Sequence, residues 1–403
     1  MRVASALELA IVADDLTGAM DAAAPFAQRG ARCQVLADAG AAVPDTAAVV
    51  AASTGSRHLS AERAAARVGV ALAGLLQRRP RLLFKKLDST LRGNVVSETL
   101  AALAASGRRH AVIAPAVPAQ GRTMRGGRVY VDGIVLADSA AGRDPLSPAL
   151  ALPLAEALRR AAPGLSVHQL GPDDDLVLGH GASPEVHVVD CVSHMDLERI
   201  VDRLLPCADR VLLVGAAGLA RALAERAFCE APACPPVVAA AGPVLAAVGS
   251  RTPQSDAQVE RLRRDGRALI LAAPDGRLDL DAALRAVSQS ASPAVLIHAR
   301  PGAGSDAARV AGSLAGLTAA LAARLAAGAL VATGGDTAQA LLAALAAPTI
   351  EVRGEILPGA VLGTISCLGR RLPLVTKAGG SGDERLLLDI FRLLEGQCRT
   401  RAG

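Results

Sequence analysis

Short apolar runs alternate with polar, glycine-containing loops and with longer stretches of helical periodicity along the chain. The run "LELAIVA" leads into "DDLTG" and then into the helical pattern of residues 19–30. The same order recurs at residues 243–266, 328–348 and 372–396. Strands that alternate with helices of this length are typical of βαβ units. The sequence therefore predicts an α/β protein whose sheets are mostly parallel and flanked by helices.

A proline-rich segment divides this pattern into two parts. The chain has 403 residues, which is more than one ordinary hydrophobic core accommodates, so two domains are expected. The segment "FCEAPACPPVVAAAGP", Phe228–Pro243, contains four of the 23 prolines and lacks a clear period, which favours a linker. We place the boundary near residues 236 to 242, so that residues 1–235 and 236–403 form the two domains.

The composition narrows the classes of function. Hydrophobic residues make up 51% of the chain and aromatic residues only 1%, which disfavours nucleic-acid modules that stack bases on aromatic rings. The formal net charge is +5, but the 43 basic and 38 acidic residues are mixed along the chain. A mildly basic surface suits small anionic substrates, and we expect neither nucleic acid nor a membrane as a partner.

Cysteine usage and hydropathy indicate in which cellular compartment the protein is expected. The seven cysteines are odd in number and form no Cys-x-x-Cys pair, which favours a reduced cytosolic protein over a disulfide framework. The amino terminus lacks the layout of a signal peptide. The apolar residues 313–333 include Arg324, so we predict an amphipathic helix followed by a strand rather than a membrane span. We therefore expect a cytoplasmic protein.

Two clusters of polar residues follow predicted strands in the first domain. The motif "ADDLTGA" (Ala13–Ala19) contains adjacent carboxylates, which repel unless a cation, a metal or substrate hydroxyls lie nearby. An alternative is that Asp15 and Thr17 only cap the next helix. The stretch "RLLFKKLDSTLRGNV" (Arg81–Val95) combines cations that bind carboxylate or phosphate with groups that bind sugar hydroxyls. The alternative for this stretch is an ion-paired turn between a strand and a helix.

Side-chain alternation selects one of the two adjacent lysines. Lys85 and Lys86 point to opposite faces of the predicted strand, and we assign only Lys86 to the site. A proline- and glycine-rich loop after the strand "HAVIA" adds an amide and a guanidinium. Together these groups suit a small, polar, anionic substrate such as a sugar acid. The predicted substrate residues are Asp14, Asp15, Thr17, Lys86, Asp88, Ser89, Arg92, Asn94, Gln120 and Arg122.

The second domain offers glycine turns rather than charged loops. The motifs "TGGDTAQ" and "KAGGSGD" lie between a strand and a helix, where backbone amides can hold phosphate groups. Neither motif is a P-loop, and no G-x-G-x-x-G fingerprint follows the first strand. Asp336 or Asp383 either reaches a magnesium ion or caps its helix. Several such turns in one domain favour a nucleoside triphosphate site.

The histidines offer no recognisable metal motif. They occur at residues 58, 110, 168, 180, 187, 194 and 298, without ligand spacing. We interpret each as structural, and the metal ligands of this chain stay unknown at this point.

These motifs resemble the four-carbon acid sugar kinase family. The matching pieces follow the family's order over nearly the whole chain, and they are "ADDLTGA", "KKLDSTLRGN", "PAVPAQGRT", Asp144–Pro145, "VGSRTPQSDAQ", "ATGGDTAQ", "EILPG" (Glu355–Gly359) and "TKAGGSGD". The first two together are quite specific, whereas the glycine motifs alone would not suffice. The chain departs from the pattern at Val117 and Ser381, where we expect an aromatic residue in most relatives. Neither departure removes a charged group.

The resemblance implies an ATP-dependent kinase that phosphorylates the 4-hydroxyl of a four-carbon sugar acid, such as threonate, erythronate or a 3-oxo-tetronate. Residues 1–235 would bind the sugar acid and residues 236–403 would bind ATP with Mg²⁺, with the active site in the cleft between the domains. We hypothesise catalytic roles for Asp15, Asp88 and Arg92. The residues assigned to the nucleotide are Ser250, Gly334, Gly335, Asp336, Thr337, Gly379, Gly380 and Gly382.

Two other classes of function stay open. A dehydrogenase or isomerase of similar acids would explain the loops of the first domain, although its dinucleotide fingerprint is absent. A sugar-acid sensor would bind the acid without turnover. The sequence also leaves open which stereoisomer binds, which aspartate is the base, and whether the chain forms a homo-oligomer.

Overall fold

The fold is described from a computed structural model that covers residues 7–143, 150–179, 181, 183–228, 239–300, 302 and 305–396. The chain divides into two compact units, residues 1–232 and 233–403, and each is described here by itself. The predicted boundary near residues 236 to 242 lies partly outside the described residues and stays a prediction.

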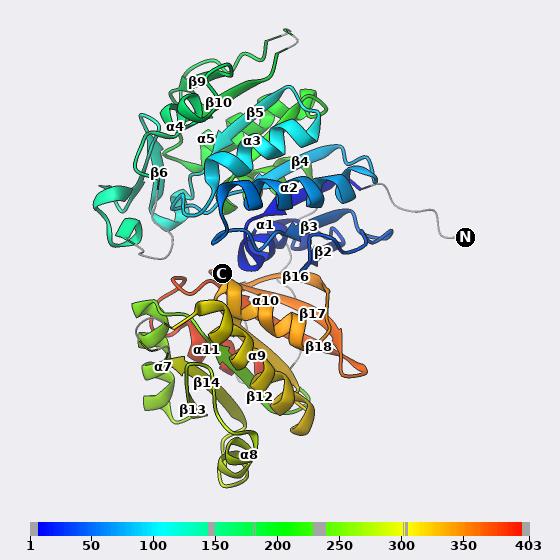
Figure 1. The fold of residues 1–403 in the computed structure, drawn as a ribbon, viewed down its shortest axis with the longest axis vertical. Coiled ribbons are helices and arrows are strands. Elements are labelled where there is room, and N and C mark those ends of the chain that lie inside the picture. The colour runs from blue at the N-terminus through cyan, green and yellow to red at the C-terminus, as the bar shows by residue number, and fades with distance from the viewer. Residues whose placement is uncertain are drawn as a thin grey trace. The chain divides into compact units, whose positions relative to one another are not determined.

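The first unit contains a large parallel sheet and a small antiparallel one (Figure 1). The strands of the large sheet are β1 (Leu9–Ala13), β2 (Cys33–Leu36), β3 (Val49–Ser53), β4 (Leu82–Lys86), β5 (His110–Ala114), β9 (Ser166–Leu170), β10 (Glu185–Val189) and β11 (Val211–Gly215). Their order is β2-β3-β1-β4-β11-β5-β10-β9, and neighbouring strands run parallel. The small sheet consists of β6 (Arg122–Arg125), β7 (Arg128–Val131) and β8 (Ile134–Val135).

Helices cover both faces of the large sheet. They are α1 (Leu16–Ala27), α2 (Ala61–Leu76), α3 (Val95–Ser106), α4 (Leu154–Ala161), α5 (His194–Leu204) and α6 (Ala217–Ala227). Helices α2, α3 and α4 share a hydrophobic core with strand residues such as Val12 and Leu83. The alternate strand residues, such as Ile11, are buried toward the opposite face, where α1, α5 and α6 pack together.

The second unit contains a mixed sheet. Its strands are β12 (Val244–Val248), β13 (Ala268–Pro274), β14 (Ala294–Arg300), β15 (Ala329–Thr333), β16 (Thr349–Leu357), β17 (Ala360–Cys367) and β18 (Arg370–Lys377). The order is β13-β14-β12-β15-β18-β17-β16, parallel as far as β18 and antiparallel beyond it. Its helices are α7 (Pro253–Asp265), α8 (Leu280–Ser288), α9 (Ala307–Arg324), α10 (Gly335–Ala344) and α11 (Leu386–Leu394). Residues of α7 and α11 share one core cluster with the sheet, whereas α9 and α10 pack against each other.

The alternation predicted from the sequence is confirmed. The four predicted pairs of strand and helix are β1–α1, β12–α7, β15–α10 and β18–α11. Residues 313–333 divide into the end of α9 and the strand β15, and no helix within the described residues has the length and apolar character needed to cross a membrane.

The antiparallel run from β16 to β18 was not predicted. Its strands are joined without helices, and Leu368 and Gly369 both have positive φ in the two-residue turn between β17 and β18. Two positive φ angles are the mark of a type I′ hairpin turn, which matches the right-handed twist of antiparallel strands. A leucine at such a position gives little signal in the sequence, because asparagine, aspartate or glycine is usual there.

Lys85 is a structural residue of the first unit. Its Nζ lies 2.8 Å from Glu98 Oε2 on α3, and the two side chains are 0% and 1% exposed. Removing one partner of such a pair typically costs about 3–5 kcal/mol, because the other charge remains buried. Lys85 and Lys86 alternate along β4, but the positive charge of Lys85 also lowers the pKa of Asp14, so Lys85 lies near the predicted site as well. The assignment of Lys86 alone to the site stays a prediction.

Candidate active site

Arg57 joins three acidic residues at the carboxyl end of the parallel sheet. It lies in the loop after β3, next to the loops that follow β1 and β4. Its Nε lies 2.7 Å from Asp14 Oδ2, and its Nη1 lies 3.0 Å from Asp15 Oδ2. Its Nη2 lies 3.6 Å from Asp88 Oδ2. The three carboxylates that the sequence predicted as one site therefore meet at one guanidinium.

Local structure fixes each carboxylate. Asp15 is the N-cap of α1, where its Oδ1 accepts a hydrogen bond of 2.8 Å from the Gly18 amide. The Thr17 hydroxyl donates to Asp15 Oδ2. Asp88 accepts from the Thr90 amide and hydroxyl and forms an ion pair of 2.7 Å with Arg92. Asp15 therefore does cap the helix, as the alternative reading of the motif held, but it also belongs to the charge cluster.

The loop that carries Arg57 is held by the motif after β4. The Asn94 amide donates to the Ser56 and Leu59 carbonyls, at 3.1 and 2.9 Å. Gly93 has a φ of 81°, and a Cβ there would lie 3.2 Å from Arg57 Cγ. The glycine thus permits both the left-handed backbone and the close approach of Arg57. Asn94 was predicted as a substrate residue; in the structure its side chain holds the loop that carries Arg57 in place.

Opposite charges keep the carboxylates ionised although they are buried. Burial by itself raises the pKa of Asp14, but the neighbouring Arg57 outweighs it and holds the pKa below its usual value. For Asp88, burial again raises the pKa, whereas Arg92 and Arg57 lower it further, so the net pKa is well below the usual range. The same three aspartates raise the pKa of Arg57 despite its burial. Asp14, Asp88 and Arg57 are therefore charged at neutral pH.

A second group of predicted residues lies beside this cluster. Arg122 Nη1 donates to the Ser89 hydroxyl at 2.7 Å and to Gln120 Oε1 at 2.8 Å. These bonds connect the loop after β4 with the loop after β5 and the start of β6. Burial lowers the pKa of Arg122, and Asp88 partly offsets this effect. Gln120, Arg122 and Ser89 are thus brought together, as predicted.

Two polar atoms face the interior of the cluster. Lys86 Nζ donates to the Leu87 carbonyl at 2.7 Å, and it lies 3.6 Å from the position that a Cβ on Gly18 would occupy. Asp14 Oδ1 is buried and has no hydrogen-bond partner among the described residues. A buried carboxylate oxygen without a donor is an acceptor for a ligand hydroxyl. The arrangement can bind a polyhydroxy acid through guanidinium groups and carboxylate oxygens.

The predicted glycine turns of the second unit also come together. The loops after β12, β15 and β18 lie on adjacent strands. A Cβ on Gly379 would lie 2.1 Å from Ser250 Oγ, so only glycine fits there. The Thr252 and Ser255 hydroxyls donate to the Gly379 carbonyl at 2.8 and 2.9 Å. Ser250 and the "AGGSG" turn are therefore in direct contact.

The helix α10 begins within the other glycine turn. Gly334, with a φ of 98°, is its N-cap, and Gly335, Asp336 and Thr337 form its first turn. Asp336 is exposed, whereas Thr337 is buried with its Oγ1 2.4 Å from a Cβ built on Gly249. Free amides at the start of a helix favour an anion.

Most of the remaining residues of the "KAGGSGD" turn are exposed to solvent, whereas Ser381 is half-buried. Gly380 and Gly382 are exposed, and Gly382 has a φ of 77°. Asp383 accepts a hydrogen bond of 2.9 Å from the Arg385 amide, but Arg385 is the N-cap of α11 and that cap has no side-chain hydrogen bond, so the choice between a cap and a magnesium ligand stays open. Ser381 lies against Gly359, whose own Cβ would meet Ser381 Cβ at 2.9 Å.

Two charged residues at the candidate sites were not predicted from the sequence. Arg57 was missed because its partners are 42 and 43 positions away; its only signal is the strand-loop-helix pattern of "VVAASTGSR". Lys377 ends β18 directly before the glycine turn, is fully buried, and donates to the Ala378 carbonyl at 2.9 Å. Burial lowers the pKa of Lys377 to about 8.

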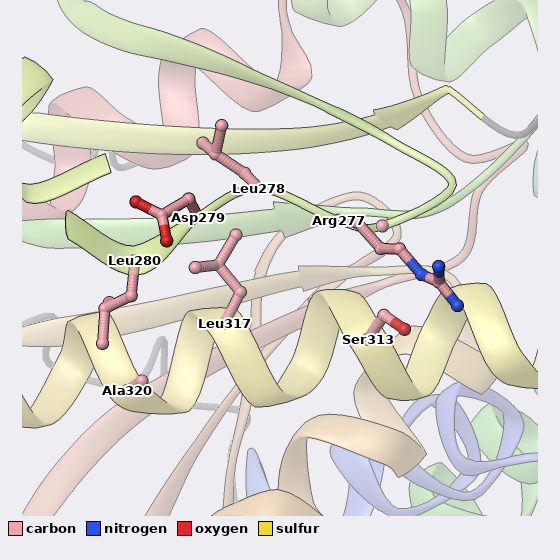
Figure 2. Close-up of a pocket in the computed structure, with 8 residues that line it drawn as sticks. Arg277, Leu278, Asp279, Leu280, Ser313, Leu317 and Ala320 are labelled. Carbon is pink, nitrogen blue, oxygen red and sulfur yellow. The ribbon is translucent and has the colours of Figure 1, made fainter. Parts of the chain in front are cut away.

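A cavity in the second unit lies apart from these turns. Its volume is about 560 Å³, and it is bounded by the loop between β13 and α8 and by α9 (Figure 2). Its lining residues are Gly276, Arg277, Leu278, Asp279, Leu280, Ser313, Leu317 and Ala320. None of the predicted nucleotide residues is among them, so the cavity gives no support to the nucleotide assignment. The predicted Asp144–Pro145 motif lies outside the described residues.

Comparison with known families supplies the class of the two units. Residues 9–223 match the model of a sugar-binding N-terminal domain, and residues 245–387 match that of a nucleotide-binding C-terminal domain. A sugar-binding domain followed by a nucleotide-binding domain is the layout of a two-domain kinase. The chain belongs to the four-carbon acid sugar kinase family.

Individual relatives agree over almost the whole length. The D-threonate kinase of Salmonella typhimurium is 31% identical over 96% of this chain and 99% of its own. The D-threonate kinase of Bordetella bronchiseptica is 35% identical over 94% and 96%. The 3-oxo-tetronate kinase of Cupriavidus necator is 29% identical over 96% and 97%.

Solved structures share the fold. A crystal structure from Salmonella typhimurium LT2 has a TM-score of 0.76 at 23% identity, and it covers 96% of this chain and 99% of its own. A Haemophilus influenzae protein has a TM-score of 0.70 at 20% identity, with the same coverage.

We predict that Arg57→Met lowers the free energy of unfolding by about 3 kcal/mol or more at pH 7, because it leaves buried carboxylates unpaired. Asp14 and Asp88 have lowered folded pKa values, so the stability they contribute is present above the unfolded pKa of about 4 and is lost as pH falls below it. The difference between wild type and variant should therefore shrink as the pH falls from about 5 toward the lowered folded pKa values. Urea unfolding across this range measures it.

The matched control for this variant is Arg63→Met. Arg63 lies exposed in the first turn of α2, and it should change stability by less than about 0.5 kcal/mol at every pH. A difference between wild type and Arg57→Met that stays constant or grows on acidification would contradict the charge cluster.

Proposed function

We propose that this protein is an ATP-dependent kinase that phosphorylates the 4-hydroxyl of a four-carbon sugar acid. The observation that carries the proposal is the buried cluster of Asp14, Asp15 and Asp88 around Arg57 in the sugar-binding unit. Such a cluster suits a substrate that presents both a carboxylate and several hydroxyls. Relatives at 29–35% identity phosphorylate threonate or 3-oxo-tetronate by name, which supports the same substrate class.

Substrate binding uses groups of both signs. The side chain of Arg92 is 29% exposed while it pairs with Asp88, so its guanidinium can also meet a ligand carboxylate. Arg122 adds positive charge near this pair, and Lys86 adds another cation at the end of β4. Asp14 Oδ1 accepts a hydrogen bond from a substrate hydroxyl, which satisfies an oxygen that has no partner within the described residues.

The nucleotide binds at the glycine turns of the second unit. The close contact of Gly379 with Ser250, and the amides at the start of α10, form a surface on which backbone N–H groups can approach a triphosphate. Lys377 adds a cation directly before the turn, and a bound phosphate would restore its pKa toward the usual value. Asp336, exposed in the first turn of α10, offers a carboxylate to Mg²⁺, which neutralises phosphate charge when bound.

The transfer step needs positioning more than covalent chemistry. The 4-hydroxyl oxygen bonds to the γ-phosphorus while the bond from that phosphorus to the bridging oxygen breaks, and ADP leaves. The hydroxyl proton passes to a carboxylate, for which Asp15 and Asp88 are the proposed acceptors. A carboxylate of low pKa can serve because the proton becomes acidic only as transfer proceeds. Both ligands must meet for this step, so we propose that it takes place in a cleft between the two domains.

The direct test is ADP release from ATP and Mg²⁺ with a panel of acids. The panel contains D- and L-threonate, D- and L-erythronate and 3-oxo-tetronates, with a control that lacks acid. We expect one acid to give ADP well above the control and to yield a 4-phosphate by ³¹P and ¹³C NMR. ATP binding without turnover for every acid would contradict this substrate class, and tight acid binding without ATP binding would indicate a sensor.

We expect Asp15→Asn and Asp88→Asn each to lower kcat by about a hundredfold or more, because loss of a positioned proton acceptor costs that much. Steady-state ADP release with the active acid measures this. The control is Asp45→Asn, whose carboxylate is 80% exposed and pairs with Arg78. Near wild-type turnover in both site variants, with a normal melting curve, would refute the assignment of these two aspartates.

Gly379→Ala should raise KM for ATP by about tenfold or more and leave the KM for the acid nearly unchanged, because the new Cβ displaces Ser250 or the turn. Gly316→Ala is the matched control, since Gly316 lies exposed on α9 with open space around it. An unchanged KM for ATP in a folded Gly379→Ala protein would remove this turn from the nucleotide site.

A further inference from the structure

Three histidines and a glutamate lie together on adjacent strands of the first unit, away from the sugar-acid residues. His110 begins β5, Glu185 begins β10, His187 follows two residues later, and His168 is in β9. The ligand atoms of His110, Glu185 and His187 all lie within 4.8 Å of one another. These histidines show no ligand spacing in the sequence and were therefore expected to be structural, because the strands that supply them are far apart along the chain.

Strand pairing explains why these side chains meet. Glu185 is the register partner of His110 on β5, and His187 is the register partner of His168 on β9. Glu185 and His187 are two residues apart on β10, so their side chains leave the same face of the sheet. His168 stacks on the His187 ring, with centroids 4.9 Å apart and planes at 16°.

The two buried histidines each direct an unpaired nitrogen into the cluster. The side chains of His110 and His187 are only 1% and 3% exposed. His110 Nδ1 and His187 Nε2 are buried and have no hydrogen-bond partner within the described residues. His110 Nε2 lies 3.1 Å from the Gly179 carbonyl oxygen. A ring nitrogen facing a carbonyl must be the protonated one, so Nδ1 carries the lone pair. Metal-binding histidines are commonly oriented by such a bond to a backbone carbonyl.

The distances fit a shared ion better than hydrogen bonds. Glu185 Oε2 lies 3.7 Å from His110 Nδ1 and 3.5 Å from His187 Nε2. Both exceed the usual length of a hydrogen bond. Two ligands of a tetrahedral zinc ion with bonds of about 2.0 Å are about 3.3 Å apart. A small closing movement would therefore let one ion contact all three atoms.

We propose that His110 Nδ1, His187 Nε2 and Glu185 form a binding site for one Zn²⁺ ion, with water as the fourth ligand. Two imidazoles and a carboxylate are a donor set that zinc uses in proteins, and imidazole disfavours Mg²⁺ and Ca²⁺. Arg109 and Arg210 lie near His110, and Glu185 supplies the opposing charge.

The position indicates a structural role for the ion. His110 and Glu185 are the first residues of their strands, whereas the sugar-acid residues follow the carboxyl ends of β1, β3, β4 and β5. The ion would connect β5 to β10, beside the edge strand β9. We therefore expect zinc to stabilise this part of the sheet without taking part in phosphoryl transfer.

A second cluster in the same unit serves as the internal control. His194, Glu198 and Glu225 are also close enough to share an ion. There His194 Nε2 is already bonded to Glu225 Oε2 at 2.5 Å, and all three residues are partly exposed. No buried nitrogen of His194 lacks a partner within the described residues, so this cluster lacks the signal that His110 and His187 give.

The test is titration of the full-length, chelator-treated protein with Zn²⁺ alone, followed by competition with a chromophoric chelator and by thermal melting. We expect one ion per chain and a raised Tm. Glu185→Gln and His187→Gln should each weaken binding by about tenfold or more and abolish the shift in Tm. His194→Gln should bind zinc as the wild type does. Glu185 is 23% exposed, so Glu185→Gln should fold even if His187→Gln does not.

Co²⁺ in place of Zn²⁺ gives an independent readout, because a four-coordinate site produces visible absorption that Glu185→Gln should lose. Failure of the wild type to bind one Zn²⁺ would overturn the proposal. So would binding that survives Glu185→Gln, or binding that His194→Gln removes.

Discussion

A single guanidinium facing three buried carboxylates is the constraint on which the sugar-binding unit depends. Without Arg57, the three neighbouring carboxylates would repel one another, and Asp14 and Asp88 would lose a charge that lowers their pKa values. Because Asp14 and Asp15 follow β1, Asp88 follows β4 and Arg57 follows β3, the charges tie together loops from three adjacent strands. The ion pairs therefore determine the shape of the site as well as its charge.

The predicted site of the nucleotide-binding unit relies on backbone amides rather than on charged side chains. Its predicted site contains glycine turns and hydroxyls, and the contact between Gly379 and Ser250 depends on the absence of a side chain rather than on charge. Backbone amides suit this task because a triphosphate brings its own charge and its own metal ion. A sugar acid carries less charge and more hydroxyls, so its unit must supply ionic groups of both signs.

Sequence reasoning succeeded where the signal is local. The strand-helix units and the alternation of Lys85 and Lys86 follow from periodicities within a dozen residues. The antiparallel strands β16 to β18 were missed because their turn contains Leu368 at a position that normally takes a residue tolerant of positive φ. Arg57 and the histidine cluster were missed because their partners are distant in sequence and meet only through sheet order. The family resemblance supplied the function, which no single motif here carries.

The charge cluster is preorganised, which is a property that favours catalysis. Oriented charges that are already in place need no rearrangement when the reacting groups arrive, and this is where enzymes gain much of their rate. Here the cost of desolvating Asp14, Asp15 and Asp88 is offset by Arg57 and Arg92 during folding rather than during each turnover. The unpartnered Asp14 Oδ1 is the exception. If a substrate hydroxyl binds there, as proposed, it would complete the hydrogen bonding of the cluster, and substrate binding and the stability of the site would favour the same arrangement.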